Sequence, residues 1–180
     1  MKKIVSIILV ISILFLSGCS INSKTPKDTN KTNQTEQKEE NVVANDKAID
    51  FTLKNIEGQE IKLSDYKGKA IIVNFFATWC PPCKAEFPGF IQLVDEYKND
   101  SNVVFVFVNV GEDKKTVEAF LNERNYKIKP LLDEKTDVAA LYRVTGIPTT
   151  VIINKEFNIE TIHIGFMEKR DLKNYIEALK

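Results

Sequence analysis

The sequence predicts an α/β fold, and three observations support this class. Segments 71–76 and 103–110 are nearly continuous runs of β-branched and aromatic residues, which is typical of strands covered on both faces. Between them, segment 81–99 places apolar residues at spacings of three and four, as in a helix that packs one face against a sheet. Two cysteines, Cys80 and Cys83, follow the first strand at its carboxyl end, where open α/β sheets bind ligands.

A β-hairpin is expected in front of this sheet. Its apolar residues alternate with polar ones on both sides of Glu57-Gly58, which predicts one packed face; they are Phe51, Leu53, Ile61 and Leu63. Pro88 lies within the predicted helix and is expected to kink it, because proline has no N–H for the carbonyl of Lys84. The later elements are expected as helices at 115–125 and 134–142, strands at 149–154 and 161–166, and a last helix at 169–179.

The first 18 residues have the pattern of a secretory signal peptide. Lys2 and Lys3 supply positive charge, and the apolar run 4–16 is shorter than the roughly 20 residues that a membrane-spanning helix needs. The run leads into Leu16-Ser17-Gly18-Cys19, which resembles the bacterial lipobox, in which the cysteine is lipidated and becomes the first residue of the mature chain. We therefore expect Cys19 to anchor the protein to the extracytoplasmic face of the cell membrane. Ordinary secretion with a leftover cysteine is the alternative.

Residues 19–44 are expected to form a disordered tether, and residues 45–180 a single domain. Between residues 20 and 41 the only aliphatic residue is Ile21, so this segment cannot bury enough surface to offset its ordering entropy. The whole chain carries 25 basic and 25 acidic residues. They are interspersed, without a basic block, so charge gives no indication of a nucleic-acid partner.

Apart from Cys19, the cysteines of Trp79-Cys80-Pro81-Pro82-Cys83 are the only ones in the chain. Their spacing suits disulfide exchange, in which one sulfur attacks a partner and the other resolves the mixed disulfide. Cys80 is the expected nucleophile, exposed at the amino terminus of a helix where free N–H groups favour a thiolate, and Cys83 is the more buried resolving thiol. The alternatives are a structural disulfide or a metal clip. A tetrahedral zinc site would need two further ligands, and His163 is the single histidine.

Pro81 and Pro82 separate the two cysteines. Both are permitted in the first turn of a helix, but neither has an N–H to donate to the sulfur of Cys80. Fewer hydrogen bonds would therefore hold a Cys80 thiolate, which favours a reducing dithiol over a strongly oxidising one.

The strand 73–78 leading into the cysteine motif, together with Gly146-Ile147-Pro148-Thr149-Thr150, resembles the thioredoxin superfamily. A narrower resemblance is to the TlpA/ResA-like membrane-anchored thiol-disulfide oxidoreductases. It rests on the lipobox, on segment 63–69 and on Glu86-Phe87-Pro88 after the dithiol. The resemblance covers residues 45–180 and implies a thioredoxin-like fold, a central mixed β-sheet flanked by helices with an added N-terminal β-hairpin.

The resemblance also implies how a substrate would be held. A cis Ile147-Pro148 bond would face the dithiol and leave the backbone of Ile147 free to pair with an extended substrate segment, as an added strand does. Trp79 would form a surface platform beside Cys80 that shields the sulfur and contacts partners.

A proton acceptor for Cys83 is expected at Glu86. Asn74 occupies the position where thioredoxins carry a buried Asp that relays protons, so this chain lacks that group. Glu86 stands one turn beyond Cys83 on the same helical face and, if desolvated, would have a raised pKa and could take the Cys83 proton. The alternative is a solvated Glu86 that only favours the helix dipole.

The resemblance implies an enzyme that reduces disulfides of extracytoplasmic proteins, with apocytochrome c as a candidate substrate and a membrane thiol as electron donor. It would need no cofactor besides its own redox-active Cys80–Cys83 disulfide. Two other classes remain open: a thiol peroxidase of the same fold, and a non-catalytic metal-binding or adhesive lipoprotein.

Overall fold

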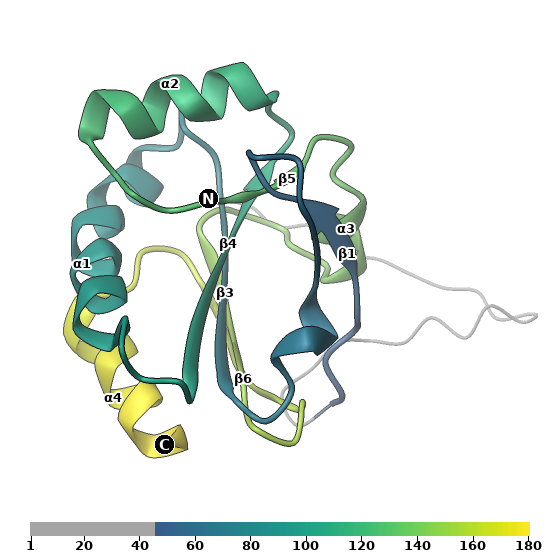
Figure 1. The fold of residues 1–180 in the computed structure, drawn as a ribbon, viewed down its shortest axis with the longest axis vertical. Helices are drawn as coiled ribbons and strands as arrows, with labels where there is room; N and C mark the ends of the chain where they lie inside the picture. Colours follow the sequence, from purple (N-terminus) through teal and green to yellow (C-terminus); the bar gives the residue numbers. More distant parts are fainter. Residues whose placement is uncertain (1–45) are drawn as a thin grey trace, which may run out of the picture. The chain divides into compact units, whose positions relative to one another are not determined.

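The computed structural model describes residues 46–180, which are built around a five-stranded sheet (Figure 1). The strand order is β5-β4-β3-β6-β7, with bounds Leu131–Asp133, Val103–Val110, Ala70–Phe76, Thr149–Ile153 and Ile159–Ile164. β3, β4 and β5 are parallel, β6 is antiparallel to β3, and β7 is antiparallel to β6. The sheet is therefore mixed, as expected. The predicted signal peptide, the Cys19 lipid site and the tether at 19–44 lie outside the described residues.

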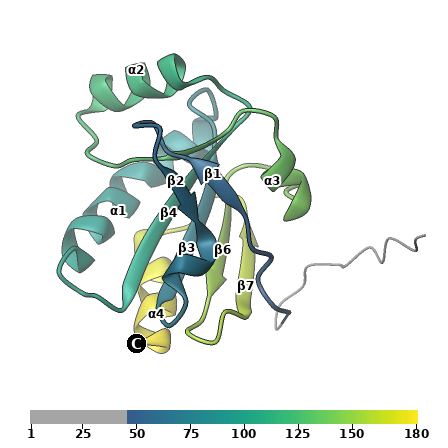
Figure 2. The ribbon, with the colours of Figure 1, turned by 45° about the vertical axis from the view of Figure 1, so that its right-hand side comes forward.

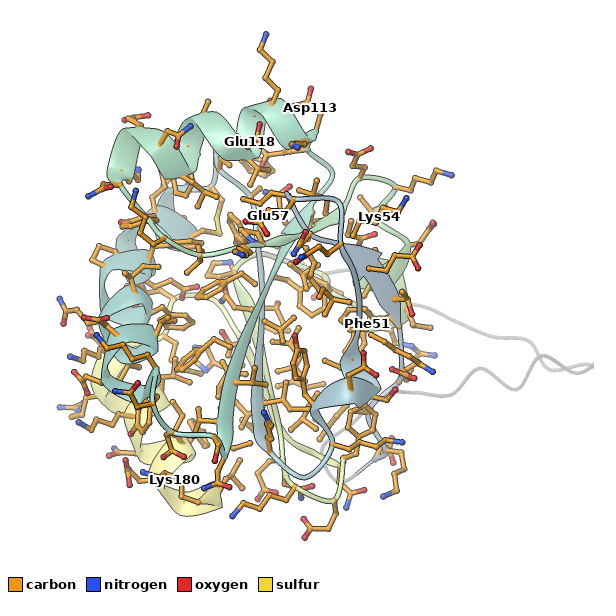
Figure 3. The ribbon with its side chains drawn as sticks, viewed as in Figure 1. Phe51, Lys54, Glu57, Asp113, Glu118 and Lys180 are labelled. Carbon is orange, nitrogen blue, oxygen red and sulfur yellow. A yellow bond between two sulfur atoms is a disulfide. The ribbon has the colours of Figure 1, made fainter. Side chains whose placement is uncertain are left out.

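Helices α1 (Pro81–Tyr97) and α4 (Lys169–Leu179) lie side by side against one face of the sheet, with α2 (Lys114–Arg124) at the end of that layer (Figures 1 and 2). Alternate residues of β3 enter two separate cores. Ile72 and Phe76 pack with the helical layer, whereas Ile71, Val73 and Phe75 pack on the opposite face. Side chains fill the interior on both faces of the sheet (Figure 3). The continuous apolar run of β3 is explained by this burial on both faces.

The expected hairpin is present as β1 (Thr52–Lys54) and β2 (Glu60–Lys62), followed by a 3₁₀ turn, η1 (Leu63–Tyr66). Leu53 and Ile61 are directly paired and pack against the second core, so the alternating pattern is confirmed. An isolated bridge between Asn55 and Leu131 joins the hairpin to β5. Thus the hairpin covers the face of the sheet opposite α1 (Figure 2).

The sequence prediction is wrong around residue 134. The helix expected at 134–142 is the short α3 (Asp137–Leu141), and β5 precedes it without having been predicted. The buried carboxylate of Asp133 accepts hydrogen bonds from the backbone N–H groups of Val138 (3.2 Å) and Ala139 (2.8 Å). It thereby caps the first turn of α3, so the helix begins beyond residue 134.

The remaining elements agree with expectation to within two residues, and α4 has the predicted bounds. Pro88 lies inside α1, which continues to Tyr97, and the kink expected there stays a prediction. Among the described residues, no helix is both long and apolar enough to cross a membrane.

Candidate functional site

Cys80 and Cys83 form a disulfide at the amino terminus of α1, with an S–S distance of 2.17 Å. Cys80 has an extended conformation (φ −76°, ψ 114°) and is the N-cap of the helix; its sulfur accepts the backbone N–H of Cys83 at 3.3 Å. Pro81 and Pro82 occupy the first two helical positions and contribute no N–H. Cys80 thus stands at the amino terminus of a helix, as expected, and its sulfur accepts one hydrogen bond from this terminus.

The expectation that the Cys80 sulfur is exposed is wrong for this oxidised state, because Cys80 is only 2% exposed. Its sulfur is bonded to the fully buried Cys83 and lies 3.6 Å from the carbonyl oxygen of Ile147, which covers it. The neighbouring Trp79 is 64% exposed. An incoming disulfide would therefore meet Trp79 and the backbone of Ile147 around a recessed sulfur.

The Ile147-Pro148 peptide bond is cis, as the family resemblance implied. Pro148 directly precedes β6, which pairs with β3 in the register Phe75 to Thr149. This pairing brings Ile147 beside Cys80, although 67 residues separate them. The carbonyl of Pro148 accepts the N–H of Gly165 at 2.7 Å, so the turn after β7 supports the proline loop.

Glu86 is buried in α1, with 2% exposure. Its Oε1 accepts from Nδ2 of Asn74 at 2.9 Å, and its Oε2 accepts from the backbone N–H of Met167 at 3.0 Å. Burial raises the pKa of Glu86 to about 7, against the two hydrogen bonds, which lower it. The solvated alternative for Glu86 is therefore wrong, and the raised pKa lies where a group can exchange protons at neutral pH.

Glu112 holds the loop that leads into the cysteine motif. Its carboxylate accepts from the backbone N–H of Thr78 at 2.6 Å, from Oγ1 of Thr78 at 2.5 Å, and from Nδ2 of Asn109 at 2.7 Å. Glu112 lies two residues after the end of β4, and Thr78 two residues after the end of β3, so this carboxylate joins the carboxyl ends of two parallel strands. The link fixes Thr78 two residues before Cys80.

Comparison with known proteins shows a consistent relationship. Residues 44–162 match the AhpC/TSA family. Thiol-disulfide oxidoreductase ResA of Geobacillus thermodenitrificans is 38% identical over 133 residues, covering 74% of this chain and 76% of the relative. ResA of Bacillus subtilis is 36% identical over 135 residues, covering 74% of each chain. The chain belongs to the AhpC/TSA family and is a ResA-like thiol-disulfide oxidoreductase.

Solved structures agree with this assignment. The chain superposes with TM-score 0.71 and 31% identity on a putative thiol:disulfide interchange protein DsbE from Chlorobium tepidum, covering 77% of this chain and 99% of that one. It superposes with TM-score 0.66 and 28% identity on the exposed lipoprotein thioredoxin Etrx1 of Streptococcus pneumoniae, covering 73% and 100%. The thioredoxin-like fold is thereby confirmed.

The structure places the site residues predicted from the sequence around the amino end of α1; they are Trp79, Cys80, Cys83, Glu86 and the Ile147-Pro148 pair. Three residues that form hydrogen bonds within this site were not predicted, namely Glu112, Thr150 and Met167. Met167 contributes only its backbone N–H, which every residue except proline has, so its identity carries no signal. Glu112 and Thr150 are common polar residues whose roles depend on the folded contacts.

His163 lies in β7, where its Nε2 is 3.0 Å from the carbonyl oxygen of Phe166. Within residues 46–180 there is no cluster of three or more His, Cys, Asp or Glu side chains suited to a metal ion.

Proposed function

We propose that this oxidoreductase reduces disulfides of proteins on the extracytoplasmic face of the membrane, to which a lipid on Cys19 anchors it. The reductive direction is supported by the small number of hydrogen bonds that the helix terminus donates to the Cys80 sulfur. Its sulfur accepts one N–H, from Cys83, because Pro81 and Pro82 have none to give. A thiolate held by few donors is less stabilised, and a dithiol whose reduced form is less stabilised is a better reductant.

The reaction proceeds in two exchange steps. The Cys80 thiolate attacks one sulfur of the client disulfide, forming a mixed disulfide and releasing the first client thiolate. Cys83 then gives its proton to Glu86 and attacks the Cys80 sulfur, which closes the enzyme disulfide and releases the second client thiolate. Glu86 and solvent return the two protons that the client thiols need. A membrane dithiol reduces the enzyme disulfide and is itself oxidised to a disulfide.

The surroundings of the disulfide support a protein client. Trp79 offers an exposed apolar surface beside Cys80, and the cis Ile147-Pro148 segment lies next to the sulfur. An extended client segment could pair with the backbone of Ile147 as an added strand does. Apocytochrome c, whose two haem-binding cysteines must be reduced before haem attachment, is the client that the family resemblance suggests.

The decisive experiment traps the client. In cells carrying the Cys83→Ala variant, the mixed disulfide on Cys80 cannot be resolved, so the client should stay covalently attached and be released by dithiothreitol. The Cys80→Ala variant is the matched control and should trap nothing. Capture of apocytochrome c would identify it as the client. Recovery of the same proteins with both variants, or of none with Cys83→Ala, would contradict the proposal.

Purified protein tests the alternatives to a disulfide reductase. The reduced wild type should accelerate the reduction of insulin by dithiothreitol, and both cysteine variants should not. A thiol peroxidase would instead consume hydrogen peroxide rapidly while leaving insulin intact. An adhesive or metal-binding lipoprotein would show neither reaction.

The anchor is tested separately from the chemistry. Wild-type protein should incorporate a labelled fatty acid and fractionate with membranes, whereas a Cys19→Ser variant should do neither. Fatty-acid labelling of Cys19→Ser, or an unlabelled wild type released into the medium, would contradict the lipid anchor.

A further inference from the structure

The side-chain amide of Asn74 is the partner of Glu86 on β3. Asn74 is 1% exposed, and its Nδ2 donates to Oε1 of Glu86 at 2.9 Å and to Oγ1 of Thr150 at 3.1 Å. Its other polar atom, Oδ1, is buried and has no hydrogen-bond partner among residues 46–180. A buried amide oxygen without a partner is unfavourable and requires a physical explanation.

Oδ1 of Asn74 is a buried acceptor without a partner, and one of the two protonation states of Glu86 needs an acceptor. Both of its oxygens face donors, Nδ2 of Asn74 and the N–H of Met167, and this arrangement suits a carboxylate, which only accepts. When Glu86 carries a proton, one of its oxygens becomes a donor and needs an acceptor. The N–H of Met167 can never accept. An asparagine amide can, because rotation by about 180° exchanges its NH₂ group for its carbonyl oxygen.

Thr150 is compatible with both orientations of that amide. Its hydroxyl now accepts from Nδ2 of Asn74. A hydroxyl is donor as well as acceptor, so after rotation it can donate to Oδ1 instead. The groups that contact Glu86 and Asn74 from β6 and from the segment before α4 therefore tolerate either state.

We propose that Asn74 is a positioning residue that turns its amide with the protonation state of Glu86, presenting Nδ2 to the carboxylate and Oδ1 to the carboxylic acid. The proposal rests on the proposed role of Glu86 as proton acceptor for Cys83. The S–H bond of Cys83 breaks, an O–H bond forms on Glu86, and that O–H finds an acceptor at once. Glu86 is thus held in one place in both states instead of leaving a buried O–H unpaired.

Few other groups influence the protonation of Glu86. Within the described part of the chain, the pKa of Glu86 is shifted by burial and by its hydrogen bonds to Asn74 and Met167, without a contribution from a charged side chain. Cys83 lies one turn before Glu86 on α1 and is tied up in the disulfide, as is Cys80. In the oxidised protein, a pH titration therefore reports Glu86 without interference from either thiol.

Nuclear magnetic resonance of the oxidised, full-length protein tests the rotation directly. The side-chain carboxyl carbon of Glu86 should titrate with a midpoint near 7, and the side-chain amide resonances of Asn74 should follow the same curve. Cross-peaks from the Nδ2 protons of Asn74 to Thr150 should be strong above the midpoint and weaken below it. Cross-peaks that stay constant while Glu86 titrates, or a Glu86 that does not titrate between pH 4 and 9, would overturn the proposal.

The Glu86→Gln variant provides a second test that needs no titration. Its side-chain amide mimics the protonated acid, because Nε2 can donate to Asn74 while Oε1 accepts from Met167. Asn74 should therefore hold the low-pH orientation at every pH. Strong cross-peaks between Nδ2 of Asn74 and Thr150 in this variant would contradict the proposal. Neither magnetic resonance test involves a client protein, so they can fail independently of the proposed disulfide reduction.

Kinetics show whether the positioning matters. Asn74→Ala should slow the release of client from the mixed disulfide by about tenfold at pH 7 and change its pH profile, while the initial attack by Cys80 is unaffected. The matched control is Asn55→Ala, since Asn55 is also a buried, hydrogen-bonded asparagine but lies in the hairpin turn. An equal change in release rate for both variants would indicate a general structural effect and overturn the assigned role.

Discussion

The backbone N–H of Met167 donates a hydrogen bond of 3.0 Å to Oε2 of Glu86, although 81 residues separate them in the sequence. This bond ties the segment before α4 to a buried carboxylate one turn beyond Cys83. The carboxylate is nevertheless unfavourable there, since burial outweighs both of its hydrogen bonds and raises the pKa of Glu86 to about 7. A raised pKa in the folded protein makes stability depend on pH.

Glu86→Gln should remove part of the pH dependence of stability. The pKa of Glu86 rises from 4.5 to about 7 on folding, so between these values the folded protein binds more protons than the unfolded chain. Stability must then fall as the pH rises through this window. Relative to Glu86→Gln, the oxidised wild type should lose about 3 kcal/mol of unfolding free energy between pH 4.5 and 8. Denaturant unfolding at a series of pH values measures this.

The matched control is Glu96→Gln on the same helix. Hydrogen bonds from Lys169 and Lys173 lower the pKa of Glu96, so its contribution has the opposite sign and is lost as the pH falls. Parallel stability curves for the wild type and Glu86→Gln would contradict the raised pKa of Glu86.

Trp79→Ala should separate client binding from thiol chemistry. Because Trp79 is 64% exposed, its removal should change the free energy of unfolding by no more than about 0.5 kcal/mol. The reduced variant should react with a small aromatic disulfide at the wild-type rate but reduce insulin more slowly. Tyr175→Ala, which removes a partly exposed aromatic residue from α4, should change neither rate. If Trp79→Ala slows the reduction of the small aromatic disulfide and of insulin by the same factor, Trp79 acts on the thiol chemistry and not on client binding.

Glu112→Gln should destabilise the protein by about 1–3 kcal/mol. One carboxylate oxygen, which accepts hydrogen bonds from half-buried donors, is replaced by an NH₂ group, which cannot accept them. Thr78 would lose part of its anchorage, and thiol exchange at Cys80 should slow as well. The control is Glu118→Gln on α2 (Figure 3), since Glu118 forms a half-exposed ion pair with Lys114 at 3.5 Å and should contribute less than about 1 kcal/mol. Equal effects of the two substitutions would exclude a special role for Glu112.

Gly89→Ala should destabilise the protein even though alanine favours helices. Gly89 lies inside α1 where α4 approaches, and an added Cβ would be 3.0 Å from Cβ of Lys169. Overpacking costs about 1–3 kcal/mol, which exceeds the gain of about 1 kcal/mol in helix propensity. Thermal and denaturant unfolding measure the net loss. Ala85→Gly, at an exposed position of α1, isolates the propensity effect. A more stable Gly89→Ala variant would show that α4 moves away freely.

The local patterns of the sequence were enough to predict most elements and the reactive motif. The bounds of α4, the strands β3 and β4 and the N-cap position of Cys80 follow from periodicity, β-branched runs and a cysteine motif placed between strand and helix. These features depend on residues close together in the chain. The cis bond at Pro148 followed from family resemblance instead, because an arbitrary X-Pro bond in a folded protein is cis in only about 5% of cases.

Only the tertiary structure decided the state of the site. The burial of Cys80 depends on the carbonyl of Ile147, the bonding of Glu86 on the N–H of Met167, and the anchorage of Thr78 on Glu112. Each contact joins segments that are at least 34 residues apart. Backbone N–H and C=O groups are the same in nearly every residue, so a sequence pattern cannot specify which of them will meet a given side chain. The burial of Cys80 and the pKa of Glu86 result from these contacts, which only the fold determines.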